Sequence, residues 1–159
     1  SDDDVVINVQ GDEPLVPPAV INQLSDGMRE HADLPMATLS EPLHSVSELL
    51  DPNVVKVVCN DHGLAMLFSR APIPYPRDSQ GRSLPECSAR HVGIYAFKVH
   101  ALRRFIALGS STLEQVEMLE QMRWLQAGHP LLVMHASEPV PGGVDTPEDL
   151  ARVQAQFGT

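Results

Sequence analysis

The sequence predicts one α/β domain with a mixed sheet flanked by helices. Short apolar runs alternate along the chain with segments whose apolar residues recur at helical spacing. The chain has 159 residues, which suits a single compact domain. Apolar residues make up 43% of the chain and aromatic residues only 4%, so we expect a mostly aliphatic core.

The first third alternates between strand and helix. Residues 4–9 are mostly apolar, which predicts a strand buried on both faces, as parallel strands are. Two prolines close the loop that follows, and a helix should begin there and continue to Met28. Residues 36–40 should form a second strand. Residues 45–50 suit one helical turn that ends at Asp51.

The middle third predicts an inserted β-hairpin. The apolar runs 54–60 and 64–70 flank Asp61-His62-Gly63, a turn sequence in which glycine can adopt a positive φ. Residues 71–89 should form a long surface loop, and residues 91–98 another strand. We therefore expect one domain over residues 1–159, with residues 54–98 as a hairpin subdomain that contributes to dimerisation.

Two helices, a strand and a last helix should complete the domain. The second helix begins with a capping box made by Ser111 and Glu114, and it should end at Gly128. A strand is expected over residues 131–136. The last helix should begin at Thr146 and run to about Gln156. The apolar face of the second helix is expected to comprise Leu113, Val116, Leu119 and Met122.

The charge balance excludes two classes of partner. The formal net charge is −10, whereas proteins that bind duplex nucleic acid or anionic lipid need a basic face.

No apolar run reaches the roughly 18–20 residues that span a bilayer. Cys59 and Cys87 form no C-x-x-C pair, which fits a protein of the reducing cytoplasm.

Two acidic residues follow predicted strands and could share a metal ion. Asp12 follows Gly11 at the end of the first strand, and Asp145 follows Gly142-Gly143 near the last helix. Mg²⁺ typically takes one or two carboxylates together with substrate phosphates. Each residue alone has a simpler interpretation, because Asp12 could cap a turn and Asp145 could stabilise the start of a helix.

A third set of candidate residues, on the strand predicted over residues 91–98, could bind a hydroxylated ligand. Alternation along the strand places His91, Gly93 and Tyr95 on one face, with Val92 and Ile94 on the other. A solvent-exposed strand face is the alternative.

Two further sets of side chains could contribute. Glu117, Glu120 and Gln121 should share one helix face, although solvent exposure alone would explain that spacing. Arg70 and Arg90 could each bind a carboxylate or phosphate, or form a surface salt bridge. No G-x-S-x-G, H-E-x-x-H or Walker motif occurs, so these residues by themselves indicate only a domain that could bind Mg²⁺ and a polar small molecule.

A set of sequence blocks extends over nearly the whole chain, beginning with V-V-I-N-V-Q-G-D-E-P-L-V. The further blocks are M-A-T-L (36–39), D-P-N-V-V-K-V-V (51–58), L-F-S-R-A-P-I-P (67–74), R-H-V-G-I-Y-A-F (90–97), L-E-Q-V-E-M-L-E-Q-M-R (113–123) and G-V-D-T-P-E-D-L (143–150). In these blocks and in their order, the chain resembles the 3-deoxy-manno-octulosonate (Kdo) cytidylyltransferases of lipopolysaccharide assembly.

The resemblance implies a fold, a reaction and a set of site residues. The fold would be that of the nucleotide-diphosphosugar transferases, usually a homodimer, and the reaction would couple CTP to Kdo to give CMP-Kdo and pyrophosphate. Asp12 and Asp145 would ligate Mg²⁺. The residues that would hold the sugar acid are Gln10, Arg70, His91, Tyr95, Glu120 and Gln121.

One departure from the family sets an expectation about this chain. Members begin with a segment similar to I-P-A-R-x-x-S-x-R-L-P-G-K-P that cradles the CTP triphosphate, and this sequence has no such segment. We therefore expect the C-terminal part of a cytidylyltransferase, inactive and poorly folded by itself. Two alternatives remain: a cytidylyltransferase for another sugar acid such as an acylneuraminate, and a non-catalytic module for sugar binding or dimerisation.

Overall fold

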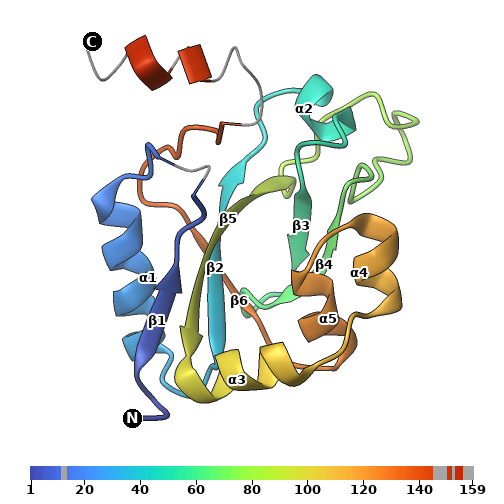
Figure 1. Ribbon diagram of the computed structural model, residues 1–159. Coiled ribbons are helices and arrows are strands. Elements are labelled where there is room, and N and C mark those ends of the chain that lie inside the picture. The colour runs from blue at the N-terminus through green and yellow to red at the C-terminus, as the bar shows by residue number, and fades with distance from the viewer. Residues whose placement is uncertain (12–13, 145–149, 152, 156–159) are drawn as a thin grey trace.

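The computed structural model describes residues 1–11, 14–144, 150–151 and 153–155. Within them, helices and strands alternate nearly as the sequence predicts (Figure 1). The elements are β1 (Val5–Asn8), α1 (Pro18–Glu30), β2 (Met36–Pro42), α2 (Val46–Leu50), β3 (Lys56–Cys59), β4 (Ala65–Ser69), β5 (Ala89–Lys98), α3 (Val99–Ala107), α4 (Thr112–Glu117), α5 (Gln121–Gln126) and β6 (Leu132–His135).

The sheet is mixed, as predicted, and β5 is its organising strand. The strand order is β4-β3-β5-β2-β6, and β1 also pairs with β5. β2 pairs along one edge of β5, whereas the other edge is shared: β1 pairs with Tyr95–Lys98 and β3 with Ala89–Arg90. Residues 91–94 of β5 therefore lie between the end of β1 and the beginning of β3.

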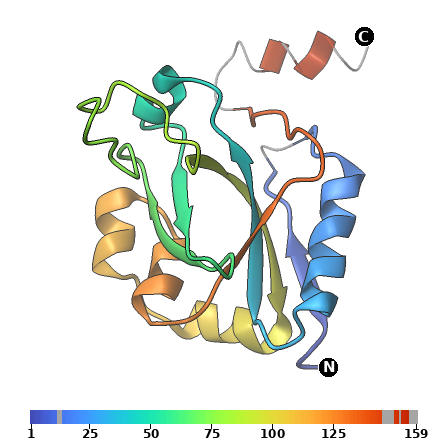
Figure 2. The same ribbon diagram turned by 180° about the vertical axis from the view of Figure 1, so that it is seen from behind.

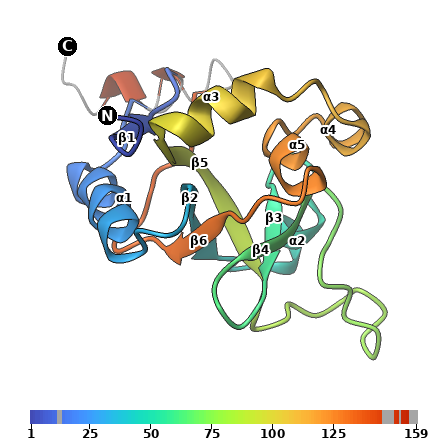
Figure 3. The ribbon, with the colours of Figure 1, turned by 90° about the horizontal axis from the view of Figure 1, so that it is seen from below.

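Helices cover both faces of the sheet. α1 packs on one face through Val20, Leu24 and Met28, and α3 and α5 pack on the other (Figures 2 and 3). The cluster under α1 is aliphatic, as expected. The cluster on the other face is also mostly aliphatic, but β4, β5, α3 and α5 bring five aromatic residues together in it: Phe68, Tyr95, Phe97, Phe105 and Trp124.

β1 differs from its prediction. Its residues alternate between partly buried and exposed, and Val6 is 39% exposed. Within the described chain β1 pairs only with β5, and it packs on α1 through Val5 and Ile7. The prediction of burial on both faces is therefore wrong.

The predicted helix after Ser111 is broken in two. Met118 adopts a left-handed conformation with φ of 54° and ends α4, and α5 begins at Gln121. Leu119 and Met122 are buried as expected, but Leu113 and Val116 are exposed. The break also separates Glu117 from Glu120 and Gln121, so the predicted common helix face is wrong.

Two remaining predictions concern the last helix and membrane-spanning segments. The last helix, expected from Thr146 to about Gln156, lies largely outside the described residues. Among the helices that the structure does describe, none combines the length and apolar character needed to cross a membrane.

Candidate functional site

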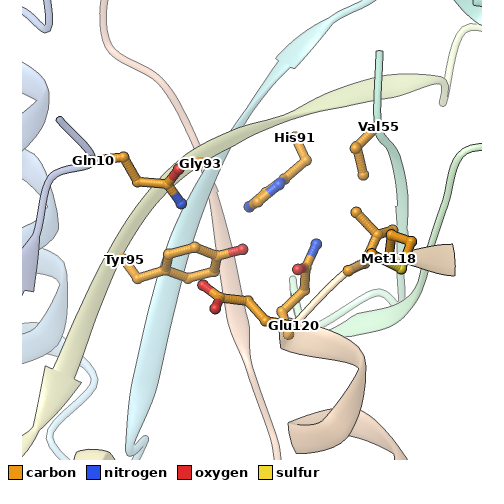
Figure 4. Close-up of a pocket in the computed structure, with 9 residues that line it drawn as sticks. Gln10, Val55, His91, Gly93, Tyr95, Met118 and Glu120 are labelled. Atoms are coloured by element: carbon orange, nitrogen blue, oxygen red, sulfur yellow. The ribbon is translucent and has the colours of Figure 1, made fainter. Parts of the chain in front are cut away.

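A cavity of about 400 Å³ opens where β1 ends and β3 begins, beside residues 91–95 of β5 (Figure 4). β5 contributes one wall, and the elbow between α4 and α5 contributes the opposite one. The lining residues are Gln10, Val55, His91, Gly93, Tyr95, Met118, Leu119, Glu120 and Gln121.

Most of the predicted sugar-binding residues meet at this cavity. Gln10, His91, Tyr95 and Glu120 come from three distant segments, and Figure 4 shows their side chains pointing toward a common centre. Gln121 lines the same cavity and is almost completely buried. The strand alternation is also as predicted, since Val92 and Ile94 pack in the cluster under α1. Whether these side chains bind a sugar stays a prediction.

The apolar part of the lining was not predicted from the sequence. Val55, Met118 and Leu119 line the cavity. Val55 belongs to the apolar run 54–60, whose pattern indicates only a strand. Met118 lines the cavity because α4 ends there, before α5 begins. A short apolar run carries no signal that distinguishes a cavity wall from a core.

His91 is held in an apolar and aromatic environment. Its ring lies edge-on to Phe68 and against Tyr95, with centroid distances of 4.9 and 5.3 Å. Its Nε2 lies 2.9 Å from the hydroxyl oxygen of Thr38 on β2. Burial, and secondarily the charge of Arg90, lowers the pKa of His91 from 6.5 to about 3. The imidazole is therefore neutral at physiological pH.

Tyr95 and Glu120 bring two polar groups near each other in the cavity. Burial, together with the negative charge of Glu120, raises the pKa of Tyr95 above its ordinary value. Tyr95 thus keeps its phenolic proton, and Figure 4 shows its hydroxyl on the same side of the cavity as the Glu120 carboxylate. This arrangement offers one donor and several acceptors to a hydroxylated ligand.

Hydrogen bonds join the elbow between α4 and α5 to the end of β4. We call the group that makes them, Ser69, Arg70 and Glu117, the clamp. The Glu117 carboxylate accepts hydrogen bonds from the Ser69 hydroxyl (2.6 Å) and the Arg70 backbone N–H (2.9 Å). In return the Arg70 guanidinium donates to the carbonyl oxygens of Glu117, Met118 and Pro52. These bonds use the peptide groups around Met118, which accounts for the end of α4 there.

These hydrogen bonds fix the position of the Arg70 side chain. Arg70 does not line the cavity, and its guanidinium is committed to three backbone carbonyl oxygens. Arg90 pairs with Glu41 and donates to the carbonyl oxygen of Val140. Among the described residues, the lining therefore contains a carboxylate and no cationic side chain. A role for Arg70 in substrate binding stays a prediction.

The two predicted metal ligands, Asp12 and Asp145, lie outside the described residues. The strands that lead to them run in the same direction, because β1 and β2 are both antiparallel to β5 and β6 is parallel to β2. The segments after β1 and β6 therefore leave the same end of the sheet (Figures 1 and 2). In the described part of the chain, no cluster of three or more His, Cys, Asp or Glu side chains could hold a metal.

The sequence is similar to a large set of known proteins. A family model described as cytidylyltransferase matches residues 1–134. Proteins named 3-deoxy-manno-octulosonate cytidylyltransferase from Pseudomonas syringae pv. tomato, Alcanivorax borkumensis and Cellvibrio japonicus are 50, 46 and 48% identical to it. The matches cover 94, 99 and 96% of this chain but only 61, 64 and 62% of those proteins. The chain thus spans less than two thirds of their length.

Solved structures share the fold. The structure of CMP:2-keto-3-deoxy-manno-octonic acid synthetase complexed with CTP matches with a TM-score of 0.87 and 40% identity, over 97% of this chain and 61% of that one. 4-Diphosphocytidyl-2C-methyl-D-erythritol synthase from Anaerococcus prevotii matches with a TM-score of 0.54 and 14% identity, over 98% of this chain and 59% of that one. The second match supports the fold alone.

The neutral His91 should make stability depend on pH. Between about pH 6.5 and 3 the unfolded chain binds a proton that folded His91 does not bind. The free energy of unfolding should therefore fall as the pH drops, by about 2 kcal/mol between pH 7 and pH 5 from this group. Urea denaturation of the full-length protein at both pH values measures the loss. His91→Asn should show a smaller loss, and equal losses would contradict the prediction.

Removing the Glu117 carboxylate should loosen the elbow. Glu117→Ala leaves the Ser69 hydroxyl and the Arg70 N–H without their acceptor, so the free energy of unfolding should fall by about 2 kcal/mol. Urea denaturation of the full-length protein measures this. Gln115→Ala, at an exposed position of the same helix, is the matched control and should change stability by less than about 0.5 kcal/mol. A similar small effect of Glu117→Ala would show that the clamp contributes little.

Proposed function

The chain belongs to the cytidylyltransferase family, and on that premise we propose that the complete protein transfers CMP from CTP to Kdo, giving CMP-Kdo and pyrophosphate. The observation that carries the proposal is the convergence of Gln10, His91, Tyr95, Glu120 and Gln121 on one cavity beside β5. These polar side chains come from segments far apart in the sequence and surround a volume suited to a small polyhydroxylated acid.

The lining suits the hydroxyl groups of a sugar acid. Glu120 offers carboxylate oxygens, Tyr95 keeps a hydroxyl that can donate or accept, and the amides of Gln10 and Gln121 can do both. The reaction requires the anomeric hydroxyl of Kdo to attack the α-phosphorus of CTP. A bond forms between that oxygen and phosphorus, the bond to the β-phosphate oxygen breaks, pyrophosphate leaves and the hydroxyl proton is released.

Both substrates are anions, and the described lining supplies no cationic side chain. We therefore include Mg²⁺ in the proposal, with Asp12 and Asp145 as its ligands. When bound, the ion would neutralise charge on the phosphate oxygens and lower the pKa of the attacking hydroxyl. The common direction of β1 and β6 supports this donor set, because the chain leaves both strands at the same end of the sheet before it reaches Asp12 and Asp145.

The proposal extends to assembly and location. We propose a homodimer to which the hairpin of β3 and β4 and the loop after it contribute. Met66 on the hairpin and Tyr75 in the loop are exposed apolar side chains, which supports this surface. Cys59 and Cys87 are free and exposed, which fits a reaction in the reducing cytoplasm.

The metal ligands give a direct test of the proposed reaction. In the full-length protein, Asp12→Asn and Asp145→Asn should each lower kcat for CMP-Kdo formation at least about a hundredfold at every Mg²⁺ concentration. Asp33→Asn, which changes an exposed carboxylate, is the matched control and should retain activity. A near-normal rate for either variant would remove that residue from the metal site.

The cavity residues give a second test. His91→Ala should raise the KM for Kdo about tenfold or more and change the KM for CTP much less, since His91 lines the sugar cavity. Steady-state kinetics with each substrate varied in turn measures the two values, and His62→Ala in the exposed hairpin turn is the control. Equal effects on both KM values would refute the proposal that this cavity holds the sugar acid.

Substrate comparison separates the alternatives. The full-length wild-type protein should use Kdo in preference to an acylneuraminate. Preference for the acylneuraminate would favour the other sugar-acid enzyme, and the absence of turnover with both would favour a non-catalytic module.

A further inference from the structure

Thr38 lies directly beside His91 on β2, and its side chain is completely buried. Its hydroxyl oxygen is 2.9 Å from Nε2 of His91, 2.8 Å from the carbonyl oxygen of Ile94 and 3.1 Å from that of Val92. The ladder between β2 and β5 shifts register here, because Thr38 pairs with Tyr95 and the next residue of β2 pairs with Val92. The hydroxyl thus supplies a donor where the ladder is interrupted.

The Thr38 hydroxyl has one hydrogen and three polar neighbours, and this determines which tautomer of His91 is favoured. A threonine hydroxyl has one hydrogen, and a carbonyl oxygen can only accept. If that hydrogen pointed to Nε2 of His91, the carbonyl oxygens of Val92 and Ile94 would both face a lone pair of the hydroxyl oxygen. The favourable arrangement sends the hydroxyl hydrogen to a carbonyl oxygen, and Nε2–H of His91 then donates to the hydroxyl oxygen.

We propose that Thr38 is a positioning residue that holds His91 as its Nε2–H tautomer and so presents Nδ1 to the cavity as a hydrogen-bond acceptor. Nδ1 has no hydrogen-bond partner among the described residues. Nδ1 is also not completely enclosed, because the fully buried side-chain polar atoms without partners among the described residues are Ser88 Oγ and His129 Nε2. A neutral ring is required, and burial keeps His91 neutral by lowering its pKa to about 3.

The tautomer determines which ligand group His91 accepts. The Nδ1 lone pair can accept a hydrogen bond from a hydroxyl, but it would repel a carboxylate or phosphate oxygen at the same place. Glu120 also presents only acceptors when ionised. The inference rests on the proposed function and adds an orientation to it: the sugar acid presents hydroxyl groups to His91 and Glu120, and its carboxylate lies away from both.

Nitrogen NMR tests the tautomer without any substrate. In the full-length protein labelled with ¹⁵N-histidine, correlation of the ring protons with the ring nitrogens should show a protonated Nε2 and an unprotonated Nδ1 for His91. His91→Asn assigns the signals by their loss, and the pattern should be unchanged between pH 5 and pH 8. A protonated Nδ1 in the wild-type protein would overturn the proposal, whether or not the protein makes CMP-Kdo.

A pair of substitutions tests whether Thr38 is responsible. Thr38→Val keeps the shape but removes the hydroxyl, so His91 should lose the wild-type pattern and the KM for Kdo should rise about tenfold, with little change in the KM for CTP. Thr38→Ser keeps the hydroxyl and should restore the pattern. If Thr38→Val retained the wild-type tautomer, Thr38 would not set it. The wild-type spectrum decides the tautomer itself even if Thr38→Val does not fold.

Discussion

The structure depends on the way one edge of β5 is divided between two strands. β1 pairs with the second half of this edge and β3 with its beginning, and the His91 N–H donates to the carbonyl oxygen of Val55 just before β3, so residues 92–94 pair with neither strand. A fully paired edge would bring a strand backbone about 4.8 Å away and leave no room beside it. The open stretch lies between His91 and Tyr95, and the side chains of these two residues border the cavity while the same strand remains at the centre of the sheet.

The opposite wall of the cavity is formed where the helical segment between α4 and α5 is interrupted. A continuous helix over residues 112–127 would place its apolar residues on one face, but the clamp formed by Ser69, Arg70 and Glu117 binds the peptide groups at the point where α4 ends. Met118 takes a left-handed backbone conformation that non-glycine residues seldom adopt. Such a conformation persists when surrounding contacts fix it, and here it turns Glu120 and Gln121 toward β5.

The helices and strands could be predicted well from the sequence because each depends on signals from neighbouring residues. The capping box at Ser111 and the alternation along residues 91–95 each depend on a few neighbouring residues, and both are present. The break at Met118 could not be predicted in this way, because it depends on a strand end about 48 residues away. Thr38 was missed for the same reason, since its importance comes from a register shift that only strand pairing reveals. The family resemblance pointed to the polar residues of the cavity but not to its apolar lining. Its role for Arg70 stays a prediction, and in the structure the guanidinium donates to three backbone carbonyl oxygens.

The central claim is that the cavity beside β5 holds the sugar acid, with its hydroxyl groups toward His91 and Glu120. A crystal structure of the complete protein with Kdo and a non-reacting CTP analogue tests this most directly. We predict that Kdo occupies the space between residues 91–95 and the elbow after α4, with a hydroxyl on Nδ1 of His91. Kdo bound elsewhere, or its carboxylate placed against His91, would contradict the account.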